Sequence, residues 1–441
     1  MHGRRRGASP GGAVRFPFGI EVGRHKRRAG GSPVKRDVDP WVFLDPERFA
    51  EDGYPHDVWT LLRAASPVAR FEPEGYRPFL ALTRQAEILQ VSSRPDIFSS
   101  TQGIVLAPAK IPIVPTEMIV SIDPPRHGPL RRAASRRFTP RAVSEERAEI
   151  GRIVGDLLDD VATAGGTEQC DFVERIAAPL PIAVISWVLG VPPGDWRLLF
   201  RWTNEIIGKD DPEFRRPGES PGQTFKRARG ELRGYLSDLI ARRRAAPTGD
   251  LISELSGAEV GGEPLDEEQL LSYCELLVEA GNETTRNAIS GGLLAFAEFP
   301  EQWEALRARP ELVPVAVEEI LRWVSPIIHF TRTATVDTEV GGQRIRAGEQ
   351  VALFYASANR DETVFDDPFA FRVDRRPNPH MAFGVGEHFC LGAHVARVEI
   401  EAVIRGLVER LSFFELAGRP ERLRSHVNGG IKKLPLSYRL K

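Results

Sequence analysis

Phe383-Gly384-Val385-Gly386-Glu387-His388-Phe389-Cys390-Leu391-Gly392 is the most informative segment of the 441-residue chain, and it lies near the C-terminal end. Its three glycines allow the backbone to take positive φ and to pass close to a flat ligand. Backbone amides turned toward the sulfur, together with the start of a following helix, would favour a thiolate at Cys390. The pattern predicts a loop that presents one thiolate to one metal.

Two other interpretations of this loop remain open from the residues alone. An isolated cysteine is commonly a small buried hydrophobic side chain. A zinc site would use His380, His388, Cys390 and His394, although structural zinc favours two pairs of closely spaced ligands and the chain has no second such pair.

The loop resembles the haem-binding signature of the cytochrome P-450 family, Phe-Gly-x-Gly-x-His-x-Cys-x-Gly, at every fixed position. The resemblance implies a mainly α-helical fold with smaller β-sheets (α+β), a single triangular domain, over residues 39–441. It also implies haem b (iron protoporphyrin IX) as cofactor, with Cys390 as the metal ligand. The loop residues that would contact this cofactor are Phe383, Gly384, Gly386, His388, Cys390 and Gly392.

Composition limits the other classes of function. Residues 1–36 carry ten Lys and Arg against one Glu, a charge of +9, which leaves −11 for the remainder of a chain whose net charge is −2. We expect residues 1–38 to be a basic disordered tail and not a nucleic-acid-binding arm, because the body has no basic reading element. Three widely spaced cysteines exclude a disulfide framework and fit a reducing compartment. The longest apolar run, residues 182–191, is too short to span a membrane. We expect the protein to be cytoplasmic and monomeric.

A second motif lies within a long helical pattern. The periodicity from Asp266 to Phe299 predicts a helix of ~33 residues, capped by Asp266 and ended by Pro300. Its middle, residues 280–285, reads Ala-Gly-Asn-Glu-Thr-Thr, which taken alone fits a close helix crossing. The segment also resembles the family's oxygen-activation motif. That resemblance implies that Glu283 and Thr284 relay protons to bound O2, and that Ala280 and Gly281 lie against the cofactor.

Basic residues elsewhere are candidates for holding the haem propionates. His127 and Arg131 are four residues apart and therefore share one face of a helix that begins by Arg126. They could grip a buried carboxylate, and the segment resembles the family helix that supplies a propionate ligand. The resemblance adds Arg332 and His380 to this set.

A charged triad is expected to support the cysteine loop. Glu319 and Arg322 have the spacing of an ion pair on one helix face, and the resemblance adds Arg375 as a third member. We interpret the triad as structural, not catalytic.

Residues 101–120 form a long loop that is apolar yet rich in proline, and we expect it to be a lid over an apolar pocket. Together with the segments after Pro326 and near the C-terminus, it predicts a substrate pocket of mainly aliphatic residues. The predicted lining consists of Ile104, Val105, Leu106, Leu277, Ala280, Ile327, Ile328, Phe330, Val427 and Ile431.

The resemblance predicts a haem-dependent monooxygenase that inserts one oxygen atom of O2 into a C–H bond of a small apolar substrate, of the lipid, terpenoid or steroid class. The chain has no nucleotide-binding fingerprint, so electrons from NAD(P)H would arrive through a ferredoxin reductase and a ferredoxin. Two alternatives are a peroxide-driven fatty-acid peroxygenase and a non-catalytic haem-binding sensor.

Overall fold

The computed structural model describes residues 38–161 and 168–441, so the predicted basic tail lies outside the described residues apart from Val38. The helices are α1 (Pro46–Glu51), α2 (His56–Ala65), α3 (Gln85–Ser92), α4 (His127–Ser135), α5 (Pro140–Asp160), α6 (Pro179–Leu189), α7 (Trp196–Ile207), α8 (Pro221–Ala245), α9 (Leu251–Ser256), α10 (Glu267–Glu298), α11 (Pro300–Ala308), α12 (Val313–Val324), α13 (Tyr355–Ala358) and α14 (Ala393–Arg410).

The strands form one larger sheet and several small ones. They are β1 (Val68–Phe71), β2 (Phe79–Leu82), β3 (Phe98–Ser99), β4 (Glu168–Asp171), β5 (Glu259–Val260), β6 (Glu263–Pro264), β7 (His329–Ala334), β8 (Thr338–Val340), β9 (Gln343–Ile345), β10 (Gln350–Phe354), β11 (Leu411–Leu416), β12 (Glu421–Arg422), β13 (Ile431–Lys433) and β14 (Pro435–Leu440). The larger sheet has the order β1-β2-β10-β7-β3. The predicted mainly helical fold with smaller sheets is confirmed.

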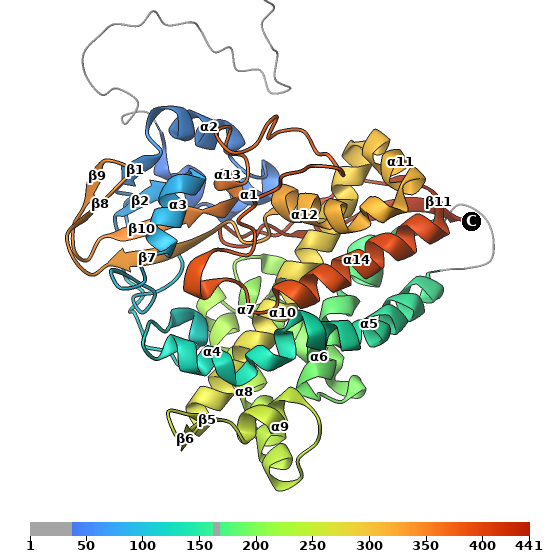
Figure 1. Ribbon diagram of the computed structural model, residues 1–441, viewed down its shortest axis with the longest axis horizontal. Helices are drawn as coiled ribbons and strands as arrows, with labels where there is room; N and C mark the ends of the chain where they lie inside the picture. The colour runs from blue at the N-terminus through green and yellow to red at the C-terminus, as the bar shows by residue number, and fades with distance from the viewer. Residues whose placement is uncertain (1–37, 162–167) are drawn as a thin grey trace, which may run out of the picture.

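The molecule is wide at the edge that holds the larger sheet and α11, and it tapers toward α9, which gives the expected triangular outline (Figure 1). The strands that the sequence predicts at 68–71 and 79–82 pair antiparallel, with Val68 opposite Leu82. Gly75 turns the chain between them with φ +76°. Hence the hairpin follows from local sequence alone.

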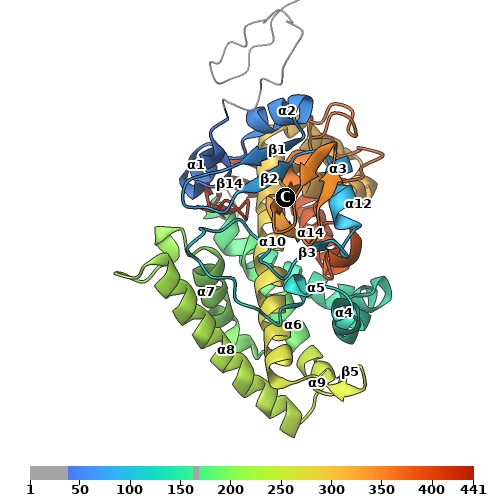
Figure 2. The same ribbon diagram turned by 90° about the vertical axis from the view of Figure 1, so that its left-hand side faces the viewer.

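Helix α10 is the axis of the fold and crosses the whole molecule (Figure 2). Its N-terminus has a capping box, in which the Asp266 carboxylate accepts from the Gln269 N–H at 2.7 Å and the Gln269 side chain accepts from the Asp266 N–H at 3.1 Å. Two acidic residues in the first turn also favour the positive end of the helix dipole. The helix packs against α6, α7, α8, α12 and α14, and its bounds confirm the prediction.

The largest core cluster surrounds α10. A second cluster lies between the sheet and the first two helices, around Phe43, Trp59 and Phe354. In the described ranges, no helix combines the length and apolar character needed to cross a bilayer. Phe383 and Leu391 of the cysteine loop pack against the cluster around α10, whereas Val385 packs against a third cluster that includes residues of β2 and β10.

Candidate active site

The cysteine loop joins the short turn Gly386–His388 to the start of α14. Gly384 and Gly386 take φ of +67° and +75°, and a Cβ at Gly386 would lie 2.4 Å from a backbone carbonyl oxygen of α3. Residues other than glycine are strained in this conformation. The Cys390 N–H donates to the Phe383 carbonyl at 2.9 Å, which closes the loop. The backbone conformation of the loop therefore favours glycine at these two positions.

Cys390 is partly exposed, and positive groups surround its sulfur. Burial raises the pKa of the Cys390 thiol, while the Gly392 N–H and the charges of Arg131 and Arg397 act in the opposite direction. A bound metal cation would lower the pKa of the thiol further, because a metal stabilises the thiolate. Arg131 also donates to the Phe389 carbonyl at 2.6 Å, so α4 is tied to this loop.

Basic side chains from three separate segments meet next to the loop. The rings of His127 and His388 lie 4.4 Å apart between centroids, and the His388 Nε2 is 3.3 Å from the Ser100 hydroxyl. Burial lowers the pKa of His388 to about 3, and the positive charges of Arg332, His127 and Arg131 add to that effect. Burial likewise lowers the pKa of His127, although Glu387 opposes it.

Arg332 supplies the test of whether haem fits this cluster. The side chain is 5% exposed and its Nη1 donates to the Thr331 carbonyl at 2.7 Å. No carboxylate among the described residues lies within ion-pair distance of it, and burial lowers its pKa. A buried cation without a counterion is costly. Haem carries two propionates, so the cluster of Arg332, His127, Arg131 and His388 fits the cofactor that Cys390 would ligate.

His380 lies outside this cluster. Its Nε2 faces the Glu318 carboxylate at 3.1 Å, its Nδ1 accepts from the Ala382 N–H at 3.2 Å, and Arg397 holds the same carboxylate. Both ring nitrogens are therefore engaged, and we correct the sequence-based assignment of His380 as a propionate ligand. The structure also argues against the zinc interpretation. In the part of the chain that it describes, no three or more His, Cys, Asp or Glu side chains lie close enough together to hold a metal ion.

Helix α10 exposes surface in its middle although most of its residues are buried. The open stretch, which we define as Leu276, Ala280 and Thr284, consists of residues four apart, and Ala280 is exposed. The Thr284 hydroxyl donates to the Ala280 carbonyl at 2.9 Å. A Cβ at Gly281 would lie 3.0 Å from Ile185, because α6 crosses at that point, and the contact of Gly281 with the cofactor stays a prediction. The glycine permits a close helix crossing.

Glu283 is 1% exposed and is not paired with its neighbour Thr284. Its carboxylate accepts from Arg286 and, at 3.2 Å, from the Asn287 amide. The Arg286 Nη1 donates to the Asn204 Oδ1 of α7 at 2.7 Å. Sequence reasoning missed Arg286, although Glu283 and Arg286 have the same spacing that identified Glu319 and Arg322.

The predicted triad forms and is fully buried. Glu319 accepts from Arg322 at 2.7 Å on each oxygen and from Arg375 at 3.1 Å. The Arg372 N–H and the Asn378 amide complete its shell at 2.9 and 3.2 Å. The two arginines donate further to carbonyls of residues 359–370, so the triad fixes the chain that leads into the cysteine loop.

The predicted apolar lining divides into two groups. The residues that are partly exposed and therefore free to face a ligand are Ile104, Val105, Ala280, Ile327, Phe330 and Val427. The residues that are packed within core clusters are Leu106, Leu277, Ile328 and Ile431. Leu106 is held from both sides, because its N–H donates to His329 at 3.3 Å and its carbonyl lies 3.1 Å from the ring of His426.

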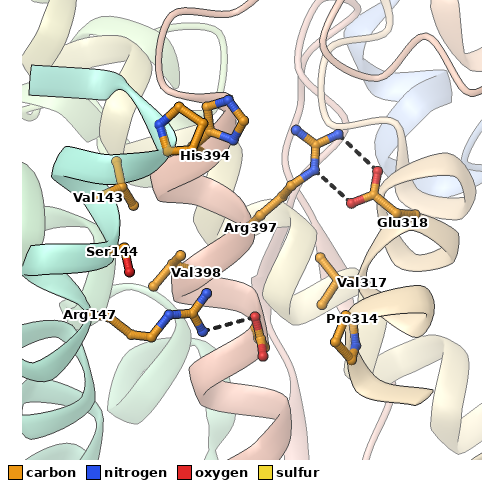
Figure 3. Close-up of a pocket in the computed structure, with 11 residues that line it drawn as sticks. Val143, Ser144, Arg147, Pro314, Val317, Glu318, His394, Arg397 and Val398 are labelled. Carbon is orange, nitrogen blue, oxygen red and sulfur yellow. Dashed lines mark hydrogen bonds and ion pairs between the residues drawn. The ribbon is translucent and has the colours of Figure 1, made fainter. Parts of the chain in front are cut away.

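A surface cavity of about 220 Å³ lies between α5, α12 and α14 and is crossed by ion pairs, among them Arg397 with Glu318 and Arg147 with Glu401 (Figure 3). None of its lining residues comes from α10 or from the predicted pocket. We therefore do not assign this cavity to substrate.

Comparison with known proteins agrees with this geometry. The family model for cytochrome P450 matches residues 218–441. A methyl-branched lipid omega-hydroxylase of Mycobacterium tuberculosis is 39% identical, over 91% of this chain and 93% of the relative. A steroid C26-monooxygenase of the same species is 36% identical, over 90% and 92%. The solved structure of Mycobacterium marinum cytochrome P450 CYP268A2 in complex with pseudoionone superposes with a TM-score of 0.83 at 33% identity, over 93% of this chain and 100% of that one.

The fold and the cysteine loop define a haem-thiolate oxygenase. The chain belongs to the cytochrome P450 family and is a monooxygenase, for which haem b and O2 are the implied cofactor and cosubstrate.

Proposed function

We propose that this enzyme hydroxylates an unactivated C–H bond of a lipid, terpenoid or steroid, with electrons delivered from NAD(P)H through a ferredoxin reductase and a ferredoxin. The single observation that carries the proposal is the pairing of the Cys390 loop with an unpaired buried Arg332 and an open stretch of α10. Haem with O2 supplies the oxidising chemistry when bound. The residues of this chain position it and handle the protons.

Each residue then has a distinct task. Cys390 would hold the iron through its thiolate, and Arg332 with His127 and His388 would hold the propionates. The Thr284 hydroxyl would pass a proton toward the cofactor, with Glu283 as the buried acid behind it. Because Glu283 is bound to Arg286, that transfer requires the carboxylate to leave its ion pair.

The proposed ferredoxin surface is the exposed end of α4. Arg132 and Arg136 are exposed and have no ion pair among the described residues, while Arg131 on the same segment contacts the cysteine loop. Acidic ferredoxins are attracted to such a surface in a salt-dependent manner. We expect Arg132→Glu with Arg136→Glu to slow haem reduction and to flatten its salt dependence. The matched control is Arg309→Glu at the C-terminal end of α11, on the opposite side of the molecule from α4 (Figure 1), and equal rates in both variants would contradict this assignment.

The substrate class follows from two sources. The partly exposed lining is aliphatic and aromatic, which favours an apolar molecule. The names of the two curated relatives, a steroid monooxygenase and a lipid hydroxylase, point to the same class.

The test begins with a carbon-monoxide difference spectrum of the reduced protein, which reports a thiolate-ligated haem. The expected result is the thiolate spectrum in the wild type and in Cys170→Ser, and its loss in Cys390→Ser. A panel of lipids, terpenoids and steroids is then scored by the spin-state shift and by substrate-dependent O2 uptake with ferredoxin. A protein that turns over only with peroxide, or that shows no substrate-dependent uptake, would instead be the peroxygenase or the sensor.

A further inference from the structure

Glu279 is a partly buried acid that the proposed mechanism does not use. It precedes Ala280 on α10, and its Oε1 is buried without a hydrogen-bond partner. Throughout the described residues, Glu279 forms no ion pair. Burial, reinforced by the charge of Glu275, raises the pKa of Glu279 to about 8. The side chain is thus a neutral carboxyl group at neutral pH, with an O–H to donate.

The nearby cations are committed elsewhere. Arg229 donates to both oxygens of Glu275, and Arg233 donates to the same carboxylate at 2.6 Å. Glu283 is turned to Arg286 and Asn287, which follow it on the helix, so it offers Glu279 no partner. A carboxyl group left unsatisfied in this way costs stability unless a ligand completes it.

The position of Glu279 on the helix relates it to the reacting centre. It lies three residues after Leu276 and five before Thr284, at the border of the open stretch. At 1.5 Å per residue, Glu279 is ~7.5 Å from Thr284 along the helix axis. A group bound there would lie several carbon–carbon bonds away from a carbon that reacts beside Thr284.

Building on the proposed function, we propose that Glu279 determines specificity by donating a hydrogen bond to an oxygen on the substrate, so that the substrate is an apolar molecule with a carbonyl or hydroxyl group remote from the oxidised carbon. A ketone or alcohol oxygen accepts such a bond, and a hydrocarbon cannot.

The experiment uses the haem-loaded enzyme and two matched pairs of probes, pseudoionone with the hydrocarbon in which its carbonyl is a methylene group, and dodecanol with dodecane. Dissociation constants come from spin-state titration of the wild type, Glu279→Leu and Glu279→Gln. A neutral hydrogen bond of ordinary strength predicts a ~2–10-fold preference for the oxygenated probe. We expect Glu279→Leu to lose this preference, and Glu279→Gln to keep it because the amide also donates.

Three results would overturn the inference. They are a wild type without preference for the oxygenated probe, a Glu279→Leu variant that retains it, and a Glu279→Gln variant that binds normally but releases more peroxide per electron, which would make Glu279 a proton carrier. Each of these results counts only for protein that shows a normal carbon-monoxide difference spectrum. Loss of that spectrum in the wild type would instead contradict the proposed function.

Discussion

Replacement of Arg332 by leucine tests the assignment of the haem site most directly, because the same guanidinium should act in opposite directions with and without cofactor. In the chain alone it is a buried cation without a counterion. With haem bound, a propionate would neutralise it. The variant Arg332→Leu should therefore bind haem more weakly and yet have a more stable apoprotein.

The magnitude follows from the contacts. Loss of one partner from a buried ion pair costs ~3–5 kcal/mol. His127 and His388 lie beside Arg332 and would still contact the propionates, so we expect the lower end, ~3 kcal/mol, which is a ~100-fold loss of haem affinity. In the apoprotein, removal of the uncompensated charge should raise the free energy of unfolding by ~1–2 kcal/mol.

The assays are haem transfer to apomyoglobin and urea unfolding of the apoprotein. Arg132→Leu on the exposed face of α4 is the matched control and should change neither quantity. Unchanged haem transfer together with a less stable apoprotein would show that Arg332 is an ordinary structural residue, and the propionate assignment would be wrong.

Three further results are expected. Glu319→Ala should lower the free energy of unfolding in urea by ~3–5 kcal/mol because it strands two buried arginines, whereas Glu304→Ala, which breaks a surface pair of 65% exposed Glu304, should cost at most ~1 kcal/mol. Gly386→Ala should destabilise the cysteine loop by ~1–3 kcal/mol, because φ is positive there and the added Cβ would lie 2.4 Å from the Ser92 carbonyl oxygen. Thermal unfolding and haem retention measure this loss. Gly194→Ala, with open space around it, is the control and should be neutral. Between pH 4.5 and about 8, the folded state keeps a proton on Glu279 that the unfolded chain has released. The free energy of unfolding should therefore fall as the pH rises through this range, by up to ~1.4 kcal/mol per pH unit from this group. Glu279→Gln should remove that part of the slope, and an unchanged slope would mean that the carboxyl is not buried.

Local spacing predicted much of the fold. The capping pair and Pro300 gave the bounds of α10, and the Gly75 turn gave the β1–β2 hairpin. The glycines of the cysteine loop and the Glu319 spacing predicted geometry that the structure contains. These features depend on backbone conformation and on residues a few positions apart, so they are visible in one sequence.

Side-chain partners from distant segments were not predictable in this way. His380 turns to Glu318, which lies 62 residues earlier in the chain. Ile328 follows Ile327 directly in the sequence and was predicted to line the same pocket, yet it packs into the second core cluster. Periodicity assigns a residue to a face, whereas the packing of another segment determines which atoms it contacts. Glu279 was passed over for the same reason, since only the commitment of Arg229 to Glu275 makes it unpaired.

Burial of a charged group does not by itself mark a ligand site. Arg360 is also buried and has no carboxylate partner in the described residues, yet it donates to the Arg322 and Trp323 carbonyls at 3.0 and 2.8 Å and stacks on the Trp323 ring at 4.2 Å. Both terminal nitrogens of Arg360 donate within the fold, although its Nε is buried without a partner, and the carboxylate of Glu319 is satisfied on both oxygens. Arg332 and Glu279 are less complete, because one hydrogen bond to the fold holds the Arg332 side chain and none among the described residues holds the Glu279 carboxyl group.

These two incomplete groups are a cation beside the cysteine loop and a neutral acid on α10, the helix that packs against α14. An anionic cofactor would complete the first, and an oxygen-bearing substrate would complete the second. If incompleteness is the right criterion, Arg332→Leu weakens haem binding without changing the oxygen preference of the substrate site, and Glu279→Leu does the reverse. Arg360→Leu should then lower only the stability of the fold, because no ligand depends on it.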